Sequence, residues 1–131
     1  MKIGTLAKRS GLSAHTIRYY ERIGLLPPPD RDAGGQRDYD AAILAWIGFL
    51  QRLKVTGMPL REMRRYAELR AEGPATGPAR RALLEAHRAG VRARVAELQA
   101  ALIVLDTKID GYAAEEERTQ DHEHDTEDPA G

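Results

Sequence analysis

The chain has 131 residues, about the length of one ordinary domain, which excludes the large α/β enzyme folds. Hydrophobic residues make up 42% and charged residues 31%, which is enough for a modest core under a very polar surface. The absence of cysteine excludes disulfides, thiolate metal sites and thiol redox switches. Charged side chains interrupt residues 1–25, so we expect no signal sequence or membrane span there, and a cytoplasmic protein.

Charge is distributed unevenly, although the formal net charge is zero. Residues 1–73 contain 13 basic and 8 acidic side chains, whereas residues 74–131 contain 7 and 12, so the two parts carry about +5 and −5. This asymmetry favours a phosphate-rich partner for the basic part. Solvated helix faces without a functional role explain the same asymmetry about equally well.

Residues 1–26 show the pattern of two short helices joined by a turn, which is a helix-turn-helix outline. Gly11 supplies the turn after the first helix, and Ser13 can cap the second, whose body is residues 14–22. The positions expected to face inward are Leu6, Ala7, Ile17 and Tyr20.

A proline run and a glycine-centred segment follow the second helix. Pro27, Pro28 and Pro29 cannot continue a helix and favour an extended chain. Residues 30–39 form the pattern of a glycine-centred turn between two short extended arms, which predicts a small wing. A phosphate-binding loop is excluded because no lysine follows at the required spacing.

Two further helices are predicted between residues 40 and 73. The first is capped by Asp40 and ends at Gly57, and Pro59 opens the second, which Gly73 and the following proline end. The predicted inward positions are Ile43, Trp46, Ile47, Leu50 and Leu53, followed by Leu60, Met63, Tyr66 and Ala67. Each of the four helices is too short to be stable alone, so they must pack together.

After a linker at residues 73–78, the pattern predicts one long helix to about residue 117, with residues 79–114 as a dimerisation segment. Apolar residues recur in steps of four and three over three heptads, at Val91, Val95, Leu98, Leu102, Leu105, Ile109 and Tyr112. On the N-terminal side Arg88 interrupts this seam before Leu84. A helix of about 60 Å is longer than the small head can cover, which favours a two-stranded coiled coil in a homodimer over packing on its own domain.

The last segment, residues 115–131, contains eight acidic side chains and one arginine and is predicted to be a disordered acidic tail. His122 and His124 lie among its carboxylates. Ordinary solvation is the favoured interpretation of these histidines over a metal site, because no rigid ligand spacing is present.

The second helix carries the side chains best suited to a nucleic acid. Ser13, His15, Thr16, Arg18 and Tyr19 can point outward together, offering hydroxyls, an imidazole and a guanidinium to a groove. In the alternative interpretation, Tyr19 and Tyr20 are core aromatics and Arg18 pairs with Glu21 or Glu62.

The order of these pieces resembles the MerR family of bacterial transcription regulators. The resemblance is strongest over residues 1–72 and is carried by Ile3-Gly4, Leu6-Ala7, Gly11-Leu12-Ser13, Thr16 to Glu21, Gly24-Leu25-Leu26, Arg37-Asp38-Tyr39, and Gly57 with Leu60. It implies operator contacts from the recognition helix by Arg18, Tyr19 and Tyr20. It also implies contacts from the wing by Arg37, with Tyr39 beside it, and a phosphate contact by Lys54.

The expected fold class is all-α, with a winged helix-turn-helix DNA-binding head at residues 1–72 followed by the long dimerising coiled-coil helix. We expect a nucleoid-associated regulator that binds a pseudo-palindromic promoter operator in double-stranded DNA as a homodimer and distorts it in response to a small effector. RNA polymerase is a partner implied by the resemblance. The two alternatives are a coiled-coil adaptor for another protein and an effector-independent architectural DNA binder or repressor.

No catalytic residue, cofactor or metal site is predicted. Metal- and redox-sensing members of the family carry cysteines at the end of the dimer helix, and this sequence contains no cysteine. Multidrug-sensing members carry a large C-terminal ligand domain, which we do not expect here. A small effector would have to bind in or beside the helices, where His87, Trp46, Tyr66 and Tyr112 are candidates that more often serve as packing residues.

Overall fold

The structure is a computed structural model that describes the backbone of residues 1–127 and the side chains of residues 1–121. The side chains of His122 and His124, and the end of the expected acidic tail, lie outside this described part. The chain divides into two compact units, Met1–Val91, which we call the head unit, and a second unit that begins at Arg92. Each unit is described separately below.

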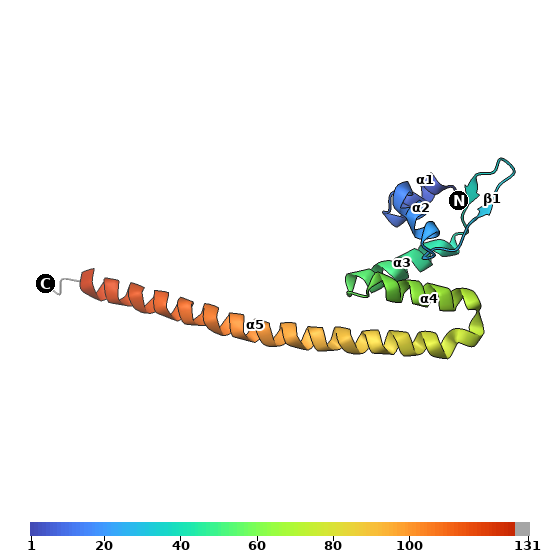
Figure 1. Cartoon of the computed structure of the whole chain (residues 1–131). Helices are drawn as coiled ribbons and strands as arrows, with labels where there is room; N and C mark the ends of the chain where they lie inside the picture. The colour runs from blue at the N-terminus through green and yellow to red at the C-terminus, as the bar shows by residue number, and fades with distance from the viewer. Residues whose placement is uncertain (128–131) are drawn as a thin grey trace. The chain divides into compact units, whose positions relative to one another are not determined.

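The chain is mostly helical, and its only strands in the described part form a small two-stranded sheet, so the expected class is confirmed (Figure 1). The elements, in chain order, are α1 (Ile3–Ser10), α2 (Ala14–Arg22), β1 (Asp30–Arg31), β2 (Arg37–Asp38), α3 (Ala42–Val55), α4 (Leu60–Glu72), the 3₁₀ helix η1 (Pro74–Thr76) and α5 (Gly77–Glu127).

The helix-turn-helix is built by the two capping residues that the sequence predicts. Gly11 adopts a left-handed conformation, with φ of 76°, and its amide donates to the Ala7 carbonyl at 3.0 Å. The Ser13 hydroxyl accepts from the Thr16 amide at 3.0 Å and so caps α2. Leu6 and Ile17, both fully buried, pack the two helices into the core.

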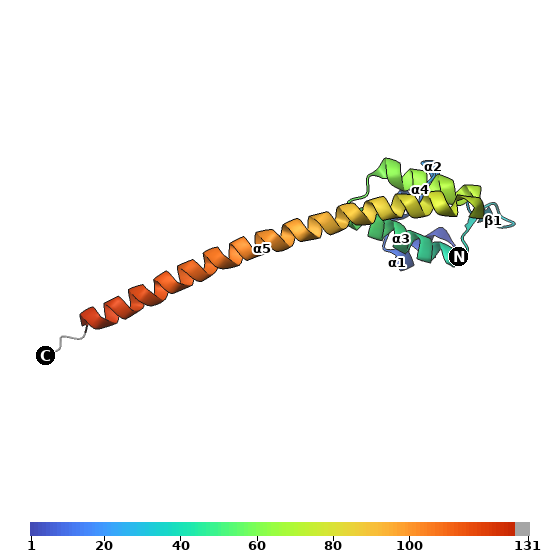
Figure 2. The same cartoon turned by 90° about the horizontal axis from the view of Figure 1, so that it is seen from below.

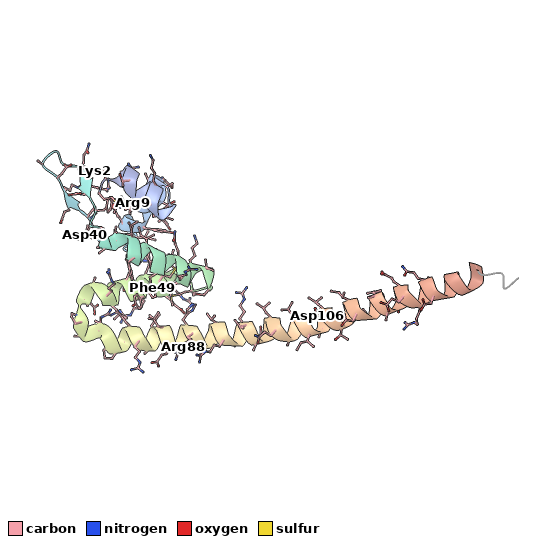
Figure 3. All side chains as sticks on the ribbon, turned by 180° about the vertical axis from the view of Figure 1, so that it is seen from behind. Lys2, Arg9, Asp40, Phe49, Arg88 and Asp106 are labelled. Atoms are coloured by element: carbon pink, nitrogen blue, oxygen red, sulfur yellow. The ribbon has the colours of Figure 1, made fainter. Side chains whose placement is uncertain are left out.

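The wing is an antiparallel hairpin in which Asp30 pairs with Asp38 and Arg31 with Arg37. Its turn is closed by the Asp32 carboxylate, which accepts from the amides of Gly34 and Gln36 at 2.9 Å each. A second carboxylate oxygen of Asp32 contacts the ammonium of Lys2, which Figure 3 shows beside the wing.

The core of the head unit lies between the helix-turn-helix, α3 and α4. All five predicted inward positions of α3 are buried, as are Met63, Tyr66 and Ala67 on α4. Leu60 was predicted to face inward but is 45% exposed, because it stands at the first position of α4, at the end of the helix. Leu69, one helical turn beyond Tyr66, is buried on the same face.

Trp46, on α3, contacts two residues of α4 and the segment after α2. Its indole nitrogen donates to the Leu25 carbonyl at 2.8 Å, its ring stacks on that of Tyr66 with centroids 5.8 Å apart, and the Arg70 guanidinium lies 4.2 Å from its centroid. The buried polar atom of the ring is therefore satisfied, and α3, α4 and the segment after α2 are held at one point.

The first turns of α5 belong to the head unit, whereas the sequence predicted a linker at residues 73–78 between the head and this helix. Residues 74–76 form η1 and α5 begins directly at Gly77. These turns stay with the head unit because the apolar side chains of Leu83 and Leu84 are partly buried against its core. The hydroxyl of Thr56, at the end of α3, also lies 2.7 Å from Nε2 of His87.

The second unit consists of the remainder of α5, which continues without a break in Figure 2. Its seam residues are exposed in the single chain: Val95 is 45% exposed, Leu102 56% and Ile109 62%. The helix continues through residues 115–127, where the sequence predicted a disordered tail. Residues 115–118 are good helix formers, and no proline or glycine follows before Pro129, so nothing in this stretch ends a helix that has already formed.

Across the described residues, α5 included, no helix combines the length and the apolar character that crossing a membrane requires.

Candidate nucleic-acid interface

The outward face of α2 carries four side chains at helical spacing: His15, Arg18, Tyr19 and Arg22. All four are exposed, and the guanidinium of Arg22 lies 5.4 Å from the centroid of the Tyr19 ring. An arginine guanidinium can donate two hydrogen bonds to a guanine edge or to a phosphate, and an exposed tyrosine hydroxyl can donate to a phosphate. This stripe is the surface of the head unit best suited to a DNA groove, and Arg22 is a member that the sequence analysis missed. The signal was present in the sequence, because Arg22 stands seven residues after His15.

Ser13 and Thr16 bind each other at the start of α2. The Ser13 hydroxyl donates to the Thr16 hydroxyl at 2.9 Å while it accepts from the Thr16 amide. Both were predicted to face a ligand. The structure places them beside the stripe, where the Ser13 hydroxyl already caps the helix by binding Thr16. The stretch still presents backbone amides at a helix N-terminus, which favours a phosphate nearby.

Tyr20 faces inward rather than outward. It is half-buried against the core and its ring centroid lies 6.1 Å from that of Tyr19. Tyr20 also lines an open groove of about 520 Å³ together with Leu12, Gln51 and Lys54. The structure therefore brings two predicted contact residues, Tyr20 and Lys54, to one groove between the helix-turn-helix and the end of α3, where Lys54 is exposed.

Glu21 joins the recognition helix to the wing. Its Oε2 accepts from Nε of Arg37 at 2.9 Å, and its Oε1 accepts from the hydroxyl of Tyr39. In one interpretation of the sequence Arg18 pairs with Glu21, but the Glu21 carboxylate binds the two wing residues instead, and Arg18 is exposed. Glu21 was missed as a positioning residue, although it and Arg37 have opposite charges.

Tyr39 lies in the core, with 3% of its surface exposed. Burial raises the pKa of its phenol above the ordinary value of 10.0, and the hydrogen bond to the Glu21 carboxylate raises it further, so the hydroxyl remains a donor at neutral pH. In the single chain the Tyr39 hydroxyl is thus engaged by Glu21 and almost none of the side chain is exposed, and its contact with DNA stays a prediction. Arg37 keeps 28% of its side chain exposed at the same edge of the wing.

The tip of the wing depends on an ionised carboxylate. The hydrogen bond from Lys2 and those from the turn amides lower the pKa of Asp32 below its ordinary value of 3.8. A depressed carboxyl pKa stabilises the folded turn above the unfolded pKa, and this contribution is lost as pH falls through the folded pKa.

We therefore expect the turn to be insensitive to pH from 7 down to 5, because Asp32 stays ionised throughout that range. The amide resonances of Gly34 and Gln36, followed by NMR during an acid titration, should move with a midpoint below pH 3.8. A midpoint above pH 5 for these two amides would show that another group controls the turn.

The candidate effector residues are mostly engaged in packing. Trp46 and Tyr66 are buried in the core, and His87 contacts Thr56. Tyr112 lies on α5 with 58% of its surface exposed and the Lys108 ammonium 5.9 Å from its ring centroid. Within the described side chains, no group of three or more histidine, aspartate or glutamate residues is arranged to hold a metal ion.

Comparison with known proteins gives consistent results along the chain. Residues 2–39 match the family described as MerR family regulatory protein, and residues 44–108 match the family described as MerR, DNA binding. An HTH-type transcriptional regulator of Haemophilus influenzae is 39% identical over 106 residues, which cover 81% of this chain and 78% of the relative. The regulator AdhR of Bacillus subtilis is 42% identical over 84 residues, 64% of this chain and 60% of its own.

Two solved structures are similar over most of the chain. A MerR family regulator from Listeria monocytogenes has a TM-score of 0.86 at 38% identity and covers 96% of both chains. HiNmlR, described as a MerR family regulator lacking the sensor domain and bound to promoter DNA, has a TM-score of 0.75 at 36% identity and covers 86% of this chain and 90% of its own.

Proposed function

Since this chain belongs to the MerR family and is a DNA-binding transcriptional regulator, we propose that it binds a pseudo-palindromic promoter operator as a homodimer and distorts it. The observation that carries the proposal is the exposed stripe of α2 beside a wing that Glu21 holds in place. Together they offer one helix for a major groove and one hairpin for the adjacent backbone.

The exposed seam on α5 supports the homodimer. It presents seven apolar side chains in a heptad pattern that the described part of the single chain leaves uncovered or only partly covered. Exposed apolar surface of this extent and regularity is typical of a helix that pairs with another. The two heads of one dimer would each read one half-site of the operator. If the half-sites are not spaced to meet both heads, the DNA must bend or untwist, and this is the physical basis of the proposed distortion.

Regulation of the promoter would follow from how the distorted DNA is presented to RNA polymerase. We propose that a small effector, if one acts, does so by changing how readily the dimer deforms its operator. Its binding site would lie within the helical scaffold.

The direct test is a gel shift of the purified protein on the DNA upstream of its own gene, with shuffled DNA of equal length and composition as the control. Binding at least about a thousandfold tighter to the upstream DNA than to the control is expected of a specific regulator. Equal binding to both would favour an architectural role, and no binding to either would favour a protein adaptor.

Lys54 is expected to contact a phosphate, because its ammonium is exposed in the groove that it shares with Tyr20. Lys54→Ala should weaken binding to all DNA sequences alike and flatten the slope of log K against log salt by about one unit. Fluorescence anisotropy at several salt concentrations measures this slope. An unchanged slope would remove Lys54 from the interface.

The Tyr39→Phe variant distinguishes a residue that positions Glu21 from a residue that contacts DNA directly. Deleting the hydroxyl removes its hydrogen bond to Glu21 and should lower the free energy of unfolding by about 1–2 kcal/mol, as measured by urea denaturation. Operator affinity, measured under conditions where the variant is fully folded, should change by less than about threefold. A large loss of affinity with no loss of stability would return Tyr39 to the set of direct contacts.

A further inference from the structure

Thr56, at the C-terminal cap of α3, lies against a histidine of α5. Its hydroxyl oxygen is 2.8 Å from the Arg52 carbonyl, 3.1 Å from the Leu53 carbonyl and 2.7 Å from Nε2 of His87. A hydroxyl has one proton to donate, and a carbonyl oxygen can only accept. The Thr56 proton therefore goes to the carbonyls at the end of α3, and the hydroxyl oxygen accepts from Nε2 of His87.

The opposite direction, from the hydroxyl to the imidazole, is unfavourable. It would leave the two carbonyl oxygens against the hydroxyl oxygen with no proton between them. The carbonyls at a helix C-terminus also carry partial negative charge, to which a donor group is complementary. His87 is therefore protonated on Nε2 and donates to the end of α3.

This hydrogen bond joins the helix of a predicted DNA contact to the helix of the seam. Lys54 stands two residues before Thr56 on α3, in the groove that it shares with Tyr20. His87 stands four residues before Val91, where the seam begins. Thr56 and His87 both belong to the head unit, so the bond acts on α5 before the helix reaches the seam.

Apolar contacts hold the same part of α5 but do not specify its orientation. Leu83 and Leu84 are partly buried against the core, and hydrophobic attraction depends on buried area rather than on direction. A hydrogen bond, in contrast, weakens steeply as its angle departs from linear. The bond from His87 to Thr56 therefore specifies how the first turns of α5 are oriented relative to α3.

A small change of this orientation has a large effect further along the helix. The seam from Val91 to Tyr112 corresponds to about 30 Å of helix at about 1.5 Å per residue. A tilt of about 10° moves the far end of a straight helix of that length by about 5 Å. One base pair added between two half-sites separates them by about 3.4 Å more, which is a displacement of the same order.

We propose that His87 is a positioning residue that, through Thr56, fixes the direction in which α5 leaves each head and thereby the half-site spacing that the dimer prefers. The proposal rests on the homodimer and the two half-sites of the proposed function. It adds to them a residue that determines specificity without touching DNA. Because each copy carries the bond, an operator with the wrong spacing would break it in both heads.

The test measures affinity for operators in which the spacing between the half-sites is changed by one and by two base pairs. The original protein should prefer one spacing. His87→Asn should reduce the ratio of affinities for the preferred spacing and for one base pair more by at least about fivefold, which is the factor that one hydrogen bond supplies. His87→Gln should keep the ratio within about twofold, because the glutamine amide nitrogen is as many bonds from Cβ as Nε2, whereas that of asparagine corresponds to Nδ1.

Thr56→Val removes the acceptor, keeps the shape of the side chain and should reduce the ratio as His87→Asn does. Thr107→Val is the matched control, because the Thr107 hydroxyl makes the same kind of bond to a carbonyl four residues earlier, that of Ile103 at 2.9 Å, but lies on α5 outside the head unit. It should leave the ratio unchanged. The double variant of His87→Asn and Thr56→Val should be no worse than either single variant, because both remove one bond.

Two further measurements distinguish positioning from other roles. Each variant should still sediment as a dimer, and its affinity for DNA with a single half-site should equal that of the original protein. An unchanged spacing ratio in His87→Asn and Thr56→Val would overturn the proposal, and so would an equal loss of affinity for the single half-site, because the reading surface itself would then be damaged.

The outcome for the original protein separates this proposal from the proposed function. If the original protein sediments as a monomer, the homodimer fails, and this proposal fails with it. If it is a dimer whose preferred spacing is unaffected by His87→Asn, or a dimer without a preferred spacing, only the present proposal fails.

Discussion

Leu102→Asp is expected to convert the dimer to monomers at micromolar protein concentration. In the single chain Leu102 is 56% exposed, so the substitution does not disturb the fold of the head unit. In the paired seam it would place two carboxylates near the middle of an apolar contact, and burying an unpaired charge costs about 3 kcal/mol or more. Operator affinity should fall when the dimer dissociates, because a monomer has one head and one head reaches only one half-site.

Ile103→Asp is the matched control for this experiment. Ile103 is the next residue, is 67% exposed and lies off the heptad seam. Sedimentation equilibrium should give a monomer for Leu102→Asp and a dimer for Ile103→Asp. A Leu102→Asp protein that stays dimeric and binds operator DNA normally would show that the seam serves a purpose other than self-association.

Arg18→Ala is expected to reduce discrimination between operator and random DNA by about 1–3 kcal/mol if the guanidinium reads a base edge. The expectation rests on the exposure of Arg18 in the middle of the α2 stripe, and on the carboxylate of Glu21, three residues further along α2, being occupied by Arg37 and Tyr39. Competition binding at a fixed salt concentration measures the discrimination directly.

Arg92→Ala removes the same charge from α5, outside the head unit, and should leave discrimination unchanged. An equal loss of affinity for operator and random DNA in Arg18→Ala would assign Arg18 to a phosphate instead. If Arg18→Ala and Arg37→Ala both left operator affinity unchanged, this face of the head unit would not be the DNA-binding surface.

The local elements could be predicted from the sequence because their signals are local. Gly11 and Ser13 mark the turn and the cap by their own chemistry, and the spacing of apolar residues identifies the buried face of α3. The wing could be predicted because its glycines lie between two short extended segments, which pair as the strands of the hairpin. Each of these inferences needs only residues within one element or its neighbours.

The errors arose where distant residues meet. That Glu21 binds Arg37 and Tyr39 depends on how β2 packs against α2, and spacing along the chain cannot show it. The same packing buries Tyr39, which by type and position was a reasonable DNA contact. The tail has a different origin, because it was predicted from composition, and glutamate-rich sequence is equally compatible with continuing a helix that precedes it.

The position of Trp46 determines what can be observed in solution. It is the chain's single tryptophan, and its buried ring packs against Tyr66 and Arg70 in the head unit. Its emission therefore reports the integrity of that unit alone, whereas far-ultraviolet ellipticity reports all the helices together, including the 51 residues of α5. Thermal melts recorded by the two signals on one sample would separate unfolding of the head unit from fraying of the helix that we propose joins two copies.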